Sequence, residues 1–169
     1  PRGAMWESCA IMMYLANVNG LDDLYPTDAG RRALVDSANF FLTGTFYPLV
    51  SRATYPRLGF ATYPGEVASS DASDDAKEKA RAEAEAALAE PLEVFRSYFV
   101  RDGFIGDGGS PTIADIRFAS TLEFLDMCDA PLPRWAQDYK NRVEEALGDA
   151  YREPAGDVRG FVAHVKSQA

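Results

Sequence analysis

Apolar residues recur every three or four positions along most of the chain, and short clusters of Gly, Pro, Asn and Ser separate these stretches. This spacing matches the 3.6-residue turn of an α-helix, whereas a half-buried β-strand alternates every two residues. Two-residue alternation is almost missing from the sequence. The pattern therefore predicts an all-α fold, a bundle of five to six helices.

The first two helices are predicted in the first third of the chain. One runs from about residue 8 to residue 17, with Ser8 as a possible cap and Asn19–Gly20 as its end. A longer helix begins after Asp28, and Gly44 and Pro48 predict a weakened or kinked second half. Its apolar positions are Leu34, Val35, Ala38, Phe41 and Leu42. We expect this second helix to contribute to the core.

Residues 53–73 interrupt the helical pattern with prolines, glycines and serines, and they predict a loop that is rich in aromatic residues. A charged, alanine-rich helix is predicted from Asp74 onward, with a possible kink at Pro91. Its apolar face consists of Ala84, Leu88, Leu92, Phe95 and Phe99. Its charges are interpreted as a solvated helix face.

The next helix has the clearest start signal in the sequence. Thr112 and Asp115 have the spacing of a capping box, with Asp in place of the usual Glu or Gln. The helix over about 113–128 is apolar nearly all round, which predicts a central and deeply buried element. Pro131 and Pro133 introduce a further predicted helix, which runs through Trp135, Tyr139 and Val143 to Leu147. A last helix is predicted from about Asp157 to the end.

Size and charge narrow the functional classes. With 169 residues and 18.5 kDa, the chain has the length of a single domain. Its net charge of -9 repels a nucleic-acid backbone and anionic lipid, so neither is expected as a partner. No stretch approaches the roughly 18 consecutive apolar residues that a membrane span requires, and we expect no membrane insertion.

The residues with reactive side chains are few. Cys9 and Cys128 lie far apart and form neither a disulfide framework nor a zinc spacing, so no metal site is expected. Cys9 near a helix start fits either a redox role or simple packing, whereas Cys128 is interpreted as packing and His164 has no catalytic partner pattern. Reduced thiols suggest the cytoplasm or a reducing organelle. The chain opens on Pro1 instead of Met, so we expect its native start to lie elsewhere.

Three segments, in the same order and spacing, resemble the cytosolic glutathione transferase superfamily. Trp6-Glu7-Ser8 with the following Cys9–Leu15 resembles the start of the last helix of that family's thioredoxin-like half. Leu24-Tyr25-Pro26 followed by Arg31, Arg32, Ala33 and Asp36 resembles the linker and first long helix of its helical half. Phe104–Asp107 with Ser110–Ile116 resembles its buried capping box. The resemblance implies a remnant of the thioredoxin-like domain at 1–20 and the all-helical domain at 21–169.

The resemblance also implies a ligand. In the family, the Glu-Ser pair holds the γ-glutamyl end of glutathione, so Glu7 would pair with the ammonium group and Ser8 would bind the carboxylate. A helix N-terminus suits an anionic group because its backbone N–H groups are free. The alternative is that Ser8 only caps its own helix. Thr112 and Asp115 have a structural role in the family, so no catalytic role is assigned to them.

No residue of this chain is assigned as catalytic. In the family, a Tyr, Ser or Cys near the start of the thioredoxin-like half activates the thiol, and a cis-proline holds the tripeptide backbone. Pro1 lies too close to Glu7 to be that proline. We therefore expect most of the thioredoxin-like half to be missing from this chain and the chain alone to be inert.

Two functions stay open at this point. The first is a transferase that conjugates glutathione to small apolar electrophiles, or reduces them, as a homodimer once its upstream half is present. Tyr47, Tyr55, Phe60 and Tyr63, with Arg52 as a polar contact, then offer an aromatic wall for the substrate, unless they only pack the core. The second is a non-catalytic helical domain that acts as an interaction or scaffold subunit of a larger assembly.

Overall fold

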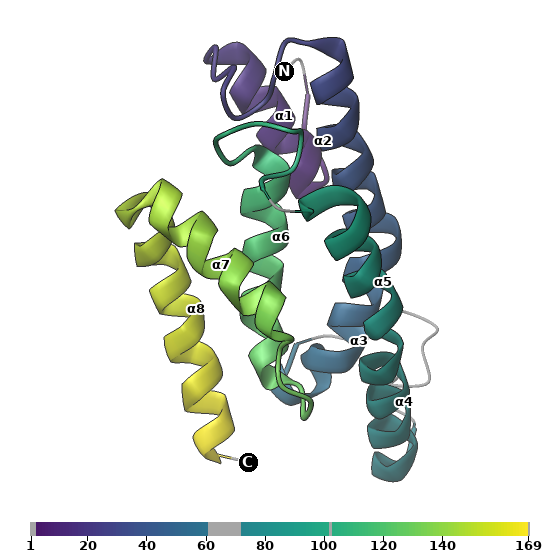
Figure 1. The fold of residues 1–169 in the computed structure, drawn as a ribbon. Coiled ribbons are helices and arrows are strands. Elements are labelled where there is room, and N and C mark those ends of the chain that lie inside the picture. Colours follow the sequence, from purple (N-terminus) through teal and green to yellow (C-terminus); the bar gives the residue numbers. More distant parts are fainter. Residues whose placement is uncertain (1–2, 61–71, 102, 169) are drawn as a thin grey trace.

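The structure is a computed structural model that describes residues 3–60, 72–101 and 103–168. The described residues are helical or irregular and contain no strand, and their helices form six continuous rods (Figure 1). The first rod is α1 (Ser8–Val18). The second joins α2 (Ala29–Phe41), the π-helix η1 (Leu42–Phe46) and α3 (Tyr47–Leu58). The third joins α4 (Asp74–Ala87), α5 (Ala89–Val94) and the π-helix η2 (Phe95–Val100). The fourth joins α6 (Ile113–Phe124) to the 3-10 turn η3 (Leu125–Met127), and α7 (Arg134–Leu147) and α8 (Asp149–Gln168) follow. The predicted all-α bundle is confirmed.

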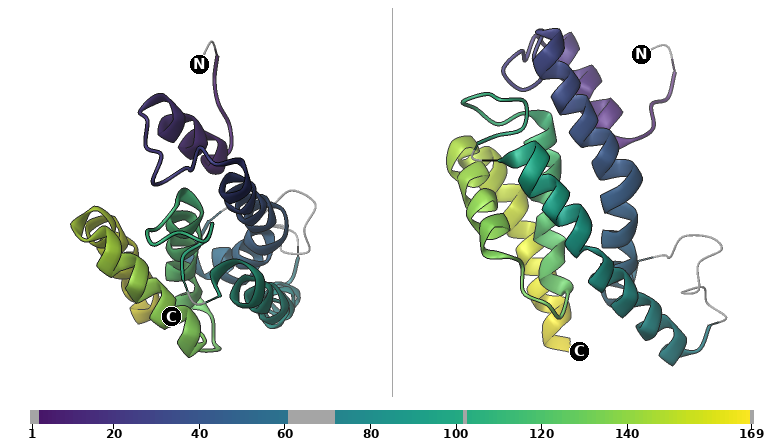
Figure 2. Two further views of the ribbon diagram at one scale, coloured as in Figure 1. Left: turned by 45° about the horizontal axis from the view of Figure 1, so that its top comes forward. Right: turned by 45° about the vertical axis from the view of Figure 1, so that its right-hand side comes forward.

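Helix α6 lies between the other rods, as Figures 1 and 2 show from three directions. It packs against α1, α2, α3, α7 and α8, which explains why its sequence is apolar nearly all round. The ring of Phe118 on α6 stacks on Phe95, with centroids 3.8 Å apart, and meets the edge of Phe46. This aromatic stack joins the second, third and fourth rods.

The second rod corrects the prediction for residues 53–73. Helix α3 continues to Leu58 and ends at Gly59, whose φ of 70° suits glycine. Ala53 and Thr54 are fully buried where α3 packs against its neighbours. Their burial outweighs the one backbone hydrogen bond that Pro56 removes, so propensity gives way to tertiary packing. Residues 61–71 of the predicted loop lie outside the described residues.

The last helix begins eight residues earlier than predicted. Helix α7 ends at Gly148, whose φ is 60°, and α8 begins at the next residue and continues through Pro154. Tyr151 and Ala155 are buried on this first part of α8, so packing against α6 and α7 extends the helix across the proline.

The segment after α1 ties that helix to the bundle. The Leu24 carbonyl accepts a hydrogen bond of 2.9 Å from the Ile113 N–H at the start of α6. The Tyr25 hydroxyl donates to Asp36 over 2.8 Å, and the Arg32 guanidinium lies 4.3 Å from the centre of the Tyr25 ring. These contacts fix the segment that joins α1 to α2. Among the described residues, no helix is long and apolar enough to cross a membrane.

Candidate functional site

Glu7 and Ser8 lie at the N-terminus of α1, and the structure assigns their positions differently from the prediction. Glu7 is the N-cap residue and Ser8 is the first residue of the helix, so Ser8 does not cap it. The Ser8 hydroxyl makes no hydrogen bond with any described residue, and both side chains are exposed. The capping alternative for Ser8 is wrong, because Ser8 is already the first helical residue and its side chain bonds no N–H group of the first turn.

Backbone donors are free at the same place. The first helical hydrogen bond joins the Ile11 N–H to the Glu7 carbonyl over 3.0 Å. The N–H groups of Ser8, Cys9 and Ala10 precede it and have no partner within the helix. No acidic residue lies in the first turn of α1 to compensate the positive end of its dipole. This end of α1 therefore offers several donors to an anionic group.

The backbone of Glu7 is strained. Its φ and ψ angles are 67° and 120°, a region that residues with a Cβ rarely adopt. Such a conformation costs on the order of 1–3 kcal/mol, and the exposed Glu7 side chain makes no hydrogen bond with the described residues that could repay it. Strain of this kind is frequent at ligand-binding sites, where the surrounding structure holds it in place.

Cys9 faces the other way. Its side chain is buried, and its Sγ lies 3.4 Å from the Thr43 Oγ1 on η1. The first turn of α1 is thus anchored by Cys9 on one side and displays Ser8 on the other. The geometry favours the packing interpretation of Cys9 over a redox role, because a buried thiol is shielded from reagents.

Thr112 and Asp115 form the capping box at the start of α6. The Asp115 carboxylate accepts from the Thr112 N–H and hydroxyl and, on its other oxygen, from the Ile105 N–H and the Tyr139 hydroxyl at 2.6 Å. Both residues are fully buried. Burial raises the pKa of Asp115, although the four donors oppose that shift. The same burial, with Asp115 beside it, raises the pKa of Tyr139 well above its usual value.

The capping box also supports α1 at a distance. It fixes the first turn of α6, and the Ile113 N–H of that turn holds the Leu24 carbonyl in the segment that follows α1. It also fixes the loop before α6 through Ile105, which is fully buried. The capping box thus also positions the segment that follows α1.

The aromatic residues proposed as a substrate wall divide into two groups. The Tyr47 and Tyr55 hydroxyls lie 2.8 Å apart on α3, and the Arg117 guanidinium of α6 lies 4.6 Å from the Tyr47 ring centre. Phe60 meets the edge of Tyr55 and stacks on Phe161 of α8. Arg52 is exposed on α3, and Tyr63 lies outside the described residues. Tyr47 and Tyr55 therefore lie on a helix, whereas Phe60 follows the end of α3 and packs against α8.

The remaining candidates have structural surroundings. Cys128 is partly buried between η3 and α4, where burial raises the pKa of its thiol to about 12, so it is almost fully protonated near neutral pH. His164 is exposed on α8 and lies 3.1 Å from the side-chain amide of Gln168. Within the described residues, no group of three or more His, Cys, Asp or Glu side chains has the geometry of a metal site.

Sequence reasoning missed a buried ion network at the other end of α6. The Glu123 carboxylate accepts from Lys140 of α7 at 3.0 Å and from Arg159 of α8 at 2.7 and 2.9 Å, and the Tyr151 hydroxyl donates to it at 3.1 Å. Glu123 is 1% exposed. Burial alone would raise its pKa, but the hydrogen bonds from Arg159 and Lys140 hold the pKa below its ordinary value. The available signal was a carboxylate, Glu123, directly between the apolar residues Leu122 and Phe124.

Comparison with known proteins agrees with this arrangement. Residues 78–144 match the family model described as the glutathione S-transferase C-terminal domain. The structure superposes on human glutathione S-transferase T1-1, in its W234R apo form, with a TM-score of 0.71 and 23% sequence identity. The match covers 94% of this chain and 65% of the human chain, so this chain spans about two thirds of its length. At this identity, the superposition shows a shared fold. Residues 78–144 are thus similar in sequence to the glutathione S-transferase C-terminal domain, and the described residues share the fold of the human enzyme.

Proposed function

We propose that the N-terminus of α1 is the γ-glutamyl-binding part of a glutathione site in a transferase. The observation that carries the proposal is the exposed first turn of α1, where an unbonded Ser8 hydroxyl lies beside three free backbone N–H groups and a strained Glu7. The match of residues 78–144 to the glutathione S-transferase C-terminal domain suggests glutathione as the ligand. The site needs no contribution from a metal ion in this proposal.

The chemistry of the γ-glutamyl group fits the two side chains. Its α-carboxylate is an anion, which a helix N-terminus and a hydroxyl donor both stabilise. Its α-ammonium is a cation, which the Glu7 carboxylate would hold one residue away. The strained backbone of Glu7 separates its side chain from those of the helix and leaves both groups open to the ligand.

In the proposed conjugation, glutathione loses its thiol proton and its sulfur bonds to an electrophilic carbon, which expels a leaving group that departs with that proton. In the proposed reduction, two glutathione molecules are oxidised to their disulfide and the electrophile takes up the two electrons and two protons. This chain contributes binding and orientation. Tyr47 and Tyr55 form an aromatic surface that suits a small apolar substrate. We assign residues 1–20 to a remnant of the thioredoxin-like domain and 21–169 to the helical domain. The exposed apolar residues Ile11, Leu15 and Val18 follow one face of α1 and support this division, because such a face is normally covered.

A scaffold subunit is the second candidate function. The same exposed face of α1, together with Trp6 at 84% exposure, also suits a protein partner. A scaffold does not require glutathione binding, whereas the transferase proposal does. The two functions therefore differ in one measurable property.

Isothermal titration calorimetry with glutathione tests the proposal. We expect a millimolar dissociation constant for the wild type, and an affinity about ten-fold lower for Ser8→Ala, since a hydrogen bond to a charged group contributes about 1.5 kcal/mol or more. Ser37→Ala is the matched control, because Ser37 is exposed on α2. γ-Glutamylcysteine should bind like glutathione, and cysteinylglycine should not. Equal binding by wild type and Ser8→Ala would contradict the proposed site, and no binding of either γ-glutamyl ligand would favour the scaffold.

A further inference from the structure

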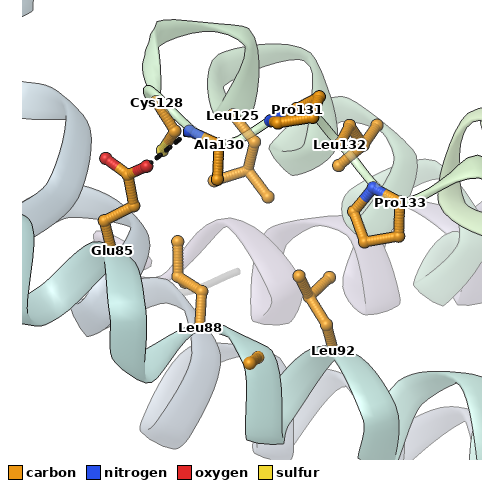
Figure 3. Close-up of a pocket in the computed structure, with 10 residues that line it drawn as sticks. Glu85, Leu88, Leu92, Leu125, Cys128, Ala130, Pro131, Leu132 and Pro133 are labelled. Carbon is orange, nitrogen blue, oxygen red and sulfur yellow. Dashed lines mark hydrogen bonds between the residues drawn. The ribbon is translucent and has the colours of Figure 1, made fainter.

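A cavity of about 150 Å³ lies on the side of the bundle where the third rod meets the segment between α6 and α7 (Figure 3). Leu88, Ala89 and Leu92 form one wall, on the turn between α4 and α5 and on α5 itself. Leu125 and Cys128 form the inner end, and residues 130–133 form the opposite wall. Apart from Glu85 at one edge, the side chains that line it are aliphatic groups, proline rings and one thiol. None of these residues belongs to the first turn of α1, where the glutathione site is proposed.

The one charged lining residue has its bonds satisfied. Glu85 accepts from the Ala130 N–H over 2.7 Å on one oxygen and from Arg81 over 2.6 Å on the other. Figure 3 shows the first of these bonds at the edge of the cavity. Glu85 therefore needs no hydrogen bond from a molecule in the cavity. A polar molecule would find few hydrogen-bond partners there.

The start of the opposite wall, residues 130–133, is fixed by charged contacts to α3 and α4. Asp129 accepts from Arg57 and Arg81, both at 2.7 Å, and Arg57 also donates to the Met127 carbonyl over 3.1 Å. Pro131 and Pro133 then restrict the backbone of the segment that follows. Because the wall is fixed at its start and stiff along its length, it cannot collapse freely into the space. The cavity is thus preformed.

We propose that this cavity binds a small apolar molecule of the size of one aromatic ring. The volume supports this class of ligand, because an apolar protein cavity of 150 Å³ accommodates benzene. The Cys128 sulfur supports an aromatic ring over an alkyl chain, since divalent sulfur makes favourable contacts with ring edges. Leu88, Leu92 and Leu125, which are 3–7% exposed, supply the apolar contacts.

Benzene is the probe for the first test, titrated into the full chain with methyl resonances of Leu88, Leu92 and Leu125 as reporters. We expect saturable shifts with a dissociation constant on the order of 1 mM, as the ligand efficiency of a six-atom molecule allows. Ala89→Phe places a ring in the mouth and should weaken binding at least about ten-fold. Ala86→Phe, at an exposed position of α4 outside the lining, is the matched control and should bind like the wild type.

Three further arms keep the outcomes distinct. Leu132→Trp fills the cavity from the opposite wall, so it gives the same test if Ala89→Phe does not fold. Ser8→Ala should leave benzene binding unchanged, which separates this proposal from the glutathione site. Unsaturable shifts, or equal binding by wild type and both filling variants, would overturn the proposal. So would methyl shifts that change with protein concentration alone, because they would show that a second copy occupies the cavity.

Discussion

Two helices of this bundle begin in opposite ways. Helix α6 begins in the core, where Thr112 and Asp115 cap it and both side chains are fully buried. Helix α1 begins at the surface, after Glu7 with its strained backbone. The side chain of its first residue, Ser8, makes no hydrogen bond to a described residue. The same free backbone donors exist at every helix N-terminus. Where the protein satisfies them itself, the end is structural, and where it leaves them open, the end is available to a ligand.

Replacing the buried cap should have the largest effect. Asp115→Ala leaves the Ile105 and Thr112 N–H groups and the Tyr139 hydroxyl without their acceptor inside the core. We expect a loss of about 4 kcal/mol in the free energy of unfolding, since each buried unsatisfied donor costs about 1–3 kcal/mol. Urea denaturation measures it. Ser8→Ala is the counterpart at α1 and should change stability by less than about 0.5 kcal/mol. Similar losses of unfolding free energy for the two variants would show that the starts of α1 and α6 do not differ in structural role.

The start of α6 could be predicted from sequence because its signal is local. Thr112 and Asp115 are three residues apart and act on their own helix. The start of α1 could not be placed as well. Ser8 is a common cap residue, and nothing in the one-letter sequence shows that Glu7 adopts a positive φ and takes the cap position. Capping preferences therefore fail at Glu7, and this is the site to which we assign a binding role.

The other failures have the same physical origin. The role of Glu123 depends on Lys140 and Arg159, which lie 17 and 36 residues away and meet it only when three helices pack. Pro56 was interpreted as interrupting the helical pattern, yet it lies inside α3, and the last helix begins at Asp149 instead of about Asp157. In each case, burial of neighbouring residues outweighs a propensity that was correct in isolation. The helical periodicity was sufficient for the bundle because every rod buries one apolar face.

Lowering the pH should reduce the stability contributed by Glu123, near the C-terminal end of α6, more than that contributed by Asp115 at its start. The lowered pKa of Glu123 means that its ionised form stabilises the fold at neutral pH, and this contribution is lost as the pH falls through the folded-state pKa. We expect Glu123→Gln to lose about 2–3 kcal/mol at pH 7, because Lys140 and Arg159 lose their counter-charge. The difference from wild type should shrink below about pH 4, near the ordinary pKa of Glu.

Denaturation at a series of pH values measures this convergence. Glu145→Gln is the control, since Glu145 is exposed on α7, and its stability should follow the wild type within about 0.5 kcal/mol throughout. Asp115, whose pKa is raised, acts with the opposite sign, because ionising its buried carboxyl becomes costly only as the pH rises. A Glu123→Gln difference that stays constant from pH 7 to pH 3 would show that the network is not ionised as described.

The smallest expected effect has the opposite direction and lies at α1. Glu7→Gly removes the side chain that makes a φ of 67° unfavourable, and glycine adopts this conformation readily. We therefore expect the variant to be more stable by about 1 kcal/mol in urea denaturation, although it should bind glutathione more weakly because the ammonium group loses its counter-charge. Glu90→Gly in α5 is the contrasting variant, since Glu90 is exposed in an ordinary helix, and it should be less stable by about 1 kcal/mol. A gain in stability coupled to a loss of affinity is the signature of strain kept for binding. If Glu7→Gly were instead less stable than the wild type, Glu7 would stabilise the start of α1 as Asp115 stabilises the start of α6. The two helix starts would then differ only in their exposure to solvent.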